Sequence, residues 1–231
     1  MELNGLSDFM ENMDWTALSA FLLSAAAVLF CLTVHEVSHG LAALALGDPT
    51  AKRQDRLSLN PLRHIDIFGT LMMLVAGFGW AKPVPVDMRY FRHPKSGMAI
   101  TALAGPVSNF ILAYLALLVR AAVLPFYMMS GTTALYLAVD FTETLAILST
   151  GLGIFNLIPV PPLDGSKVLE GILPDRVYYT ILRYENLGML LLMVVLFTGI
   201  TDAPLWAARS WVLNTMAEGT VWLFELVCNL I

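Results

Sequence analysis

Long apolar segments alternate with short polar ones along this chain. Five segments are long enough to cross a bilayer, which takes about 20 mostly apolar residues in a helix. They are Trp15–Leu46, Gly97–Leu124, Thr133–Ile158, Tyr178–Ile200 and Leu205–Ile231. The last segment carries Arg209, Glu218 and Glu225, so it could instead lie along the membrane interface. A further apolar stretch, Ile67–Trp80, is too short for a comfortable crossing. The pattern predicts an all-α polytopic membrane protein of about five to six transmembrane helices, with a short re-entrant or β-like membrane-associated segment.

The composition agrees with a multispanning membrane protein in contact with the lipid bilayer. Charged residues make up 13% of the chain, about half the average of roughly 25% for globular proteins. The net charge of −5 is small and scattered, which argues against nucleic acid as a partner. Cys31 and Cys228 lie in apolar stretches, which excludes a disulfide framework and a cysteine zinc site. We expect a single membrane-embedded domain, 1–231, with its core at about 15–170 and C-terminal helices at about 178–231; the pattern favours no oligomeric state.

The basic residues are distributed asymmetrically between the predicted loops. Eleven of the thirteen share one side if Ile67–Trp80 dips into the membrane and returns and the later spans alternate. They are Lys52, Arg53, Arg56, Arg63, Lys82, Arg89, Arg92, Lys95, Lys167, Arg176 and Arg183. By the positive-inside rule this side is the cytoplasm. We expect a multi-pass protein of a prokaryotic plasma membrane.

The sequence His35-Glu36-Val37-Ser38-His39 lies in the last third of the first apolar segment. On a helix, His35 and His39 project from one face, one turn apart, so both imidazoles can hold one Zn²⁺. Glu36 lies beside them, where a carboxylate can take a proton from water at the metal. Ionisable residues within a membrane span indicate a functional site. The motif therefore predicts a zinc site toward the cytoplasmic end of the first span.

A catalytic zinc site needs a third protein ligand. Asp164 is the best candidate, because Pro161-Pro162-Leu163-Asp164-Gly165 follows a span at the same depth as the histidines. The prolines break the helix, and Gly165 permits a tight turn behind the carboxylate. The same pattern is also typical of a plain helix exit. His64 and His93 lie in polar loops, where we expect them to be solvated rather than bound to metal.

These motifs together resemble the site-2 protease family of intramembrane zinc metalloproteases, peptidase family M50, in its compact form without a PDZ or CBS domain. The resemblance covers about Val34 to Leu169 and is specific in order and spacing. Its motifs are His35–His39, Asn60–Asp66, Gly77–Val86, Ala104–Asn109 and the Pro-Pro-Leu-Asp-Gly block. It implies that Asp164 is the third zinc ligand and that Asn156 belongs to the active site.

The resemblance and the residues together predict an intramembrane zinc metalloprotease. His35, His39 and Asp164 hold one Zn²⁺ per chain, Glu36 is the general base, and the amide of Asn156 is a donor to the oxyanion. The substrate is a transmembrane protein or peptide, which must unwind before a carbonyl can reach the metal. The proline-rich stretch Lys82–Val86 is either an edge strand that pairs with the unwound substrate or a membrane-surface loop.

Two alternatives place the same residues in other functions. A membrane zinc-binding or zinc-transporting protein without protease activity would also carry intramembrane His and Asp. Transporters usually show paired halves, however, and no internal repeat is visible here. A membrane zincin of another family would use a glutamate ligand such as Glu143, Glu170 or Glu185. The block around Asp164 argues against that assignment.

Overall fold

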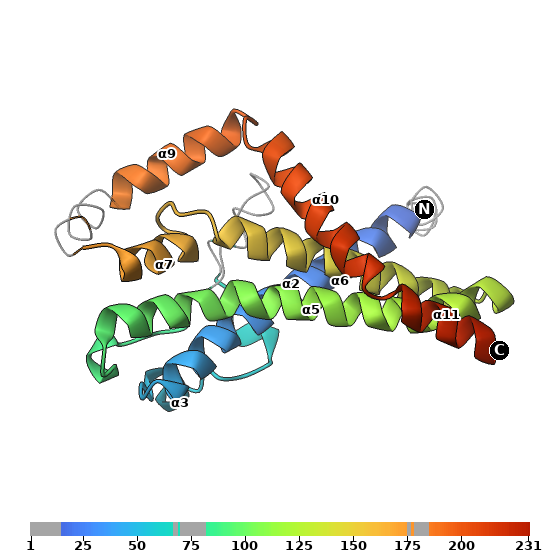
Figure 1. Ribbon diagram of the computed structural model, residues 1–231, viewed down its shortest axis with the longest axis horizontal. Coiled ribbons are helices and arrows are strands. Elements are labelled where there is room, and N and C mark those ends of the chain that lie inside the picture. The colour runs from blue at the N-terminus through green and yellow to red at the C-terminus, as the bar shows by residue number, and fades with distance from the viewer. Residues whose placement is uncertain (1–14, 67–68, 70–81, 175–176, 178–184) are drawn as a thin grey trace, which may run out of the picture.

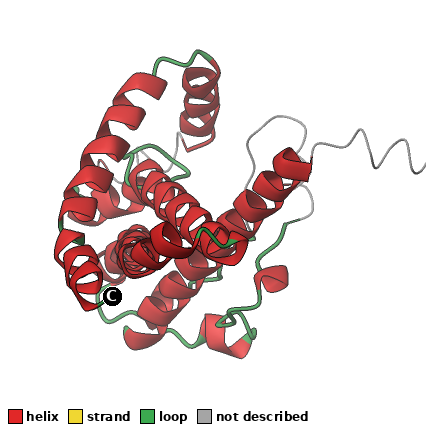
Figure 2. Ribbon diagram, turned by 90° about the vertical axis from the view of Figure 1, so that its right-hand side faces the viewer, coloured by secondary structure: helices red, strands yellow, loops and turns green. Residues whose placement is uncertain are grey.

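The fold is described from a computed structural model, which covers residues 15–66, 69, 82–174, 177 and 185–231. All regular secondary structure within these residues is helical, and they contain no strand (Figure 2). The all-α prediction is confirmed to this extent. The predicted membrane-associated stretch Ile67–Trp80 lies outside the described residues, apart from Gly69.

Three long helices form the body of the molecule (Figure 1). They are α2 (Trp15–Ala45), α5 (Pro94–Ser130) and α6 (Thr133–Asn156). Each one contains an apolar window long enough to cross a membrane. The bounds of α2 and α6 lie within two residues of the prediction, whereas α5 extends beyond it at both ends. These three predicted spans are confirmed as helices.

Small side chains fill the contact between these helices. Ala27 of α2, Ala113 of α5 and Ala146 of α6 are fully buried in the core. Large apolar side chains such as Phe21 and Ile111 lie on the outside. Membrane helices pack in this way, because small residues let the backbones approach while lipid solvates the large apolar side chains.

Four shorter helices form the described C-terminal part, and residues 178–184, at the start of the predicted span Tyr178–Ile200, lie outside the described residues. The four helices are α7 (Asp164–Ile172), α9 (Glu185–Phe197), α10 (Asp202–Glu218) and α11 (Val221–Leu230). The chain bends by 86° between α9 and α10, through a turn in which Gly199 has a φ of 70°. α10 packs against α6, and α11 packs against α5 (Figure 1). The described residues therefore contain three candidate spans, or four if the bent pair counts as one, against the five to six predicted.

Two polar loops lie together at the end of α2 and the start of α5 (Figure 1). The first contains α3 (Thr50–Arg53) and the 3-10 helix η1 (Pro61–Arg63), and the second contains the 3-10 helix η2 (Met88–Tyr90). Buried Asp48 joins the loops, because its carboxylate accepts hydrogen bonds from the backbone N–H of Thr50 at 2.9 Å and of Asp87 at 2.7 Å. The two basic loops thus share one end of the molecule; that this end faces the cytoplasm stays a prediction.

Candidate metal centre

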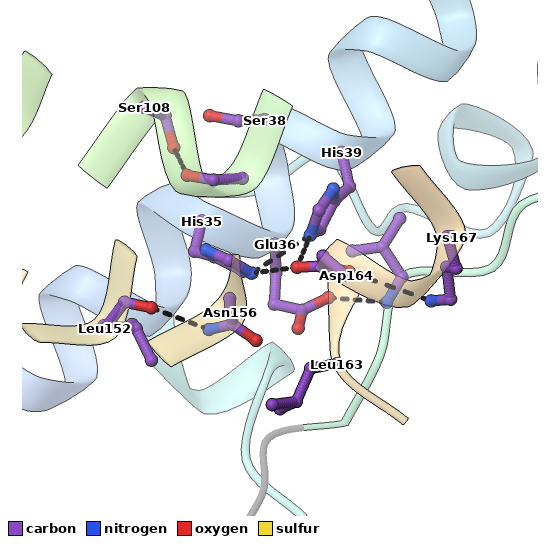
Figure 3. A network of polar contacts seen from close by, with 12 residues as sticks. His35, Glu36, Ser38, His39, Ser108, Leu152, Asn156, Leu163, Asp164 and Lys167 are labelled. Atoms are coloured by element: carbon purple, nitrogen blue, oxygen red, sulfur yellow. Dashed lines mark hydrogen bonds and ion pairs between the residues drawn. The ribbon is translucent and has the colours of Figure 1, made fainter. Parts of the chain in front are cut away.

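The structure brings together the three residues that the sequence proposes as zinc ligands. Nε2 of His35 lies 3.0 Å from Oδ2 of Asp164, and Nε2 of His39 lies 3.2 Å from the same oxygen. The two Nε2 atoms are 3.0 Å apart. All three residues are buried, and their side chains point toward one another from α2 and α7 (Figure 3).

The geometry and chemistry of this cluster fit a single zinc ion. With ligand bonds of about 2.0–2.2 Å, adjacent ligand atoms of a tetrahedral zinc are about 3.3–3.6 Å apart. The observed separations of 3.0–3.2 Å are close to that value. Two imidazoles and one carboxylate are a donor set typical of catalytic zinc sites, which keep a fourth position for water.

The orientation of His39 is fixed by α5. Its Nδ1 lies 2.7 Å from the backbone oxygen of Thr101, which can only accept a hydrogen bond. Nδ1 therefore carries the hydrogen, and Nε2 presents its lone pair to the cluster. The sequence does not reveal this contact, because any residue at position 101 would supply the same carbonyl.

Gly105 lets α5 approach the two histidines closely. A Cβ at this position would lie 2.5 Å from Cε1 and Nε2 of His39 and 2.6 Å from Cε1 of His35. Real Cβ contacts essentially never become this short. Gly105 lies in the motif Ala104–Asn109, but its residue type alone does not predict its role, which is to leave room for both imidazole rings.

Asp164 is the first residue of α7, which starts after an irregular segment that follows α6. The tight turn predicted at Gly165 is wrong, because Gly165 lies within α7. Its missing side chain instead allows α7 to pack onto the backbone oxygens of Leu157 and Ile158, the latter 2.6 Å from a built Cβ. This packing places Asp164 opposite the histidines. Nζ of Lys167, one turn further, lies 3.8 Å from Oδ1 of Asp164.

Glu36 and Asn156 lie beside the cluster (Figure 3). Oε2 of Glu36 accepts a hydrogen bond of 2.8 Å from the backbone N–H of Val84. Nδ2 of Asn156 donates to the backbone oxygen of Leu152 at 3.0 Å, which uses one of its two amide hydrogens. The second hydrogen can serve another acceptor.

The other candidate ligands lie elsewhere. His35, His39 and Asp164 are the one metal-ligand group found among the described residues. Glu143 pairs with Arg120 at 3.1 Å. Glu170 is buried but does not belong to the cluster, and the side chain of Glu185 is outside the described part of the structure.

The expectation that His64 and His93 are both solvated holds for one of them. His93 is exposed at the N-terminus of α5. His64 is only 3% exposed, and its Nε2 donates to the backbone oxygen of Ser58 at 2.7 Å. The expectation for His64 is therefore wrong, because the histidine is buried and hydrogen-bonded to the backbone of its own loop.

The possible edge strand at Lys82–Val86 is absent from the described structure. Residues 82–87 have an irregular backbone. Pro83 and Pro85 have no N–H, and the N–H groups of Lys82 and Val84 are bonded to the His64 backbone oxygen and to Glu36. In this conformation the segment has few free donors for pairing with another strand.

Comparison with known proteins identifies the family. The chain is 35% identical to YwhC of Bacillus subtilis, named as a candidate zinc metalloprotease, over 94% of its own length and 98% of the relative. The family model described as peptidase family M50 matches residues 123–199, which contain Asn156 and Asp164. The chain belongs to peptidase family M50. It is accordingly a zinc metalloprotease, and its substrate is a protein.

Two further relatives are less similar in sequence to this chain. Identity is 28% to Rip2 of Mycolicibacterium smegmatis, over 77% of this chain and 68% of the relative. It is 26% to the zinc metalloprotease MJ0392 of Methanocaldococcus jannaschii, over 85% of this chain but 46% of the relative. The comparison with solved structures gave no match.

Proposed function

We propose that this M50 protease cleaves peptide bonds within or near the transmembrane segments of membrane proteins. The observation that carries the proposal is the position of the ligand cluster between two candidate membrane spans. His35 and His39 lie inside the candidate span Ala17–Ala45, and Gly105 contacts them from inside a second span. Gly105 is eleven residues from the start of α5, which corresponds to about 16 Å along the helix. This position supports the cleavage of substrate segments that lie in the membrane.

His35, His39 and Asp164 are the proposed ligands of one zinc ion per chain. A zinc ion held there would lower the pKa of a bound water to about 7 and would polarise the scissile carbonyl. Glu36 takes the proton from the attacking water and returns it to the departing amine nitrogen. Oε2 of Glu36 accepts the hydrogen bond from the Val84 N–H, and we assign this proton exchange to the other oxygen, Oε1.

Asn156 is the proposed hydrogen-bond donor to the oxygen of the scissile carbonyl. It ends α6 beside Glu36 (Figure 3), and one of its amide hydrogens remains available in the described structure. A side-chain amide in this position can stabilise negative charge that develops on the carbonyl oxygen.

We place the centre toward the cytoplasmic side of a prokaryotic plasma membrane. The motif lies in the last third of α2, next to the two loops that carry most of the basic residues. The positive-inside rule assigns these loops to the cytoplasm. The bacterial relatives support a prokaryotic membrane.

The test compares the Glu36→Gln and Asp164→Ala variants with the wild type. We expect Glu36→Gln to retain about one zinc per chain and lose cleavage, since the amide cannot accept the proton. Asp164→Ala should lose both zinc and cleavage. Mass spectrometry of membrane fragments from wild-type and Glu36→Gln cells identifies the substrates. Cleavage sites confined to soluble tails would contradict the proposal and leave a membrane-anchored protease of ordinary type.

A further inference from the structure

Arg56 is a buried arginine in the first polar loop. It is 8% exposed, and its guanidinium donates to the backbone oxygens of Lys82 at 2.6 Å and Pro83 at 3.4 Å. It forms no ion pair with a carboxylate among the described residues. Burial of a charge without a counter-ion is costly, so the contacts with these two carbonyl groups are the evident compensation.

The two carbonyl groups belong to a segment that is held at several points. At its start, the Lys82 N–H donates to the backbone oxygen of His64 at 2.8 Å. At its end, the Asp87 N–H donates to Asp48. Between them, the Val84 N–H donates to Oε2 of Glu36. The 82–87 segment thus runs between fixed ends, with one donor aimed at the proposed base.

Arg56 acts on the same peptide unit that contacts Glu36. The carbonyl of Pro83 and the N–H of Val84 belong to one planar peptide, in which the two groups point in opposite directions. A guanidinium that holds the Pro83 oxygen on one side therefore directs the Val84 N–H to the other side. The shorter contact with Lys82 fixes the preceding peptide as well.

The Val84 side chain also fixes the segment. It is buried, and its Cγ1 lies 3.1 Å from the position that a Cβ of Gly40 would occupy. Gly40 follows Glu36 by four residues, so both lie on one face of α2. Val84 therefore packs on α2 one turn away from the carboxylate that its N–H binds.

We propose that Arg56 is a positioning residue for the catalytic base. It fixes the peptide between Pro83 and Val84, which holds Oε2 of Glu36 and leaves Oε1 to the reacting water. This inference rests on the proposed role of Glu36 as general base. Arg56 itself does not contact the metal ligands in the described structure.

The test uses a fluorogenic transmembrane peptide, a Leu-Ala helix with a central Asn-Pro-Gly, in detergent micelles with the full-length protein. Arg56→Met removes the donors at similar length, and Arg53→Met is the matched control, since Arg53 lies three residues away at the surface. We expect kcat to fall about 10- to 100-fold for Arg56→Met, because a misplacement of about 1 Å has this effect. KM and zinc content should stay within about twofold of the wild type. Arg53→Met should not change kcat.

A second pair of variants tests the path through Val84. Val84→Pro removes the backbone N–H that donates a hydrogen bond to Glu36, whereas Val84→Ala retains this N–H. We expect Val84→Pro to lower kcat about as much as Arg56→Met. The double variant should be no slower than either, because Val84→Pro removes the Val84–Glu36 hydrogen bond and Arg56→Met acts only through that same bond. Hydrogen exchange of the 82–87 segment should become faster in Arg56→Met.

The outcomes separate this inference from the proposed function. Peptide cleavage that persists in Glu36→Gln, or is absent in the wild type, contradicts the proposed function. If Glu36→Gln is inactive but Arg56→Met has the wild-type kcat, only the positioning role is wrong. It is also wrong if the losses multiply in the double variant, or if Arg56→Met loses zinc or unfolds, because Arg56 would then support the fold or the metal site instead.

Discussion

Gly105→Ala is the smallest change that should disturb the metal centre without touching a ligand. The new Cβ would lie 2.5 Å from His39 and 2.6 Å from His35. Ordinary contacts begin at 3.4 Å, so relief requires a shift of about 0.9 Å at the His39 ring. Zinc sites tolerate deviations of only about 0.2 Å in ligand distance. The imidazole rings therefore cannot move far enough to relieve this contact and still keep their distances to the zinc ion.

The expected loss is in zinc affinity more than in stability. Changes in the groups that orient zinc ligands typically lower affinity by about 10- to 100-fold. That range corresponds to about 1.4–2.7 kcal/mol. Alanine favours a helix over glycine by about 1 kcal/mol, which offsets part of the overpacking cost of about 1–3 kcal/mol. The melting temperature of the metal-free protein should therefore change little while zinc binding weakens.

Competition with a chromophoric chelator measures the affinity, and Gly151→Ala in α6 is the control. Its Cβ would meet only Cδ of Arg209 at 3.6 Å, an ordinary contact. We expect this variant to bind zinc as the wild type does. A zinc affinity within about twofold of the wild type for Gly105→Ala, or an equal loss for both variants, would refute the reasoning.

Three further predictions address α7, the topology and the substrate. Gly165→Ala should lower the zinc content and destabilise the protein by about 1–3 kcal/mol, because the new Cβ would clash with the backbone of Leu157. Metal analysis and thermal unfolding measure the two effects, and a variant with unchanged zinc content and stability would contradict the prediction. In a Cys228→Ser background, cysteines at positions 54 and 95 should both be protected from an impermeant thiol reagent in intact cells, and labelling of one alone would place the two loops on opposite sides. Cleavage should slow when Gly, Pro or Asn near the scissile bond of a substrate span is replaced by Leu, since unwinding costs up to about 3 kcal/mol more without Pro; product analysis by mass spectrometry would reject this if rates ignored helix propensity.

Three of the predicted spans and the clustering of the three candidate ligands are the features that the sequence predicts well. α2 and α6 lie within two residues of their predicted bounds, because a long and largely apolar segment has few alternatives to a helix in a membrane. His35, His39 and Asp164 converge as predicted, since zinc chemistry restricts the residue types and the motif restricts their spacing. Both predictions follow from strong physical constraints on residue type.

The C-terminal helices show where such constraints are weaker. Hydropathy favours a continuous crossing at Leu205–Ile231, whereas the structure divides it between α10 and α11 and bends the chain by 86° before α10. The bend depends on a left-handed backbone at Gly199, and the division depends on packing against α5 and α6. Neither feature has a signal in the periodicity of the apolar residues.

The metal centre is supported by backbone atoms and by the space that a glycine leaves. His39 is oriented by the carbonyl of Thr101, Glu36 by the N–H of Val84, and both imidazoles have space because residue 105 lacks a Cβ. A carbonyl or an N–H is present at almost every position, so its use at one position leaves no mark in the residue type. The exception is a side chain that fixes such a backbone group, as Arg56 does for the peptide before Val84. A buried arginine that has no acidic partner among the described residues, and that contacts the loop beside the His-Glu motif, therefore indicates how the backbone part of the site is held.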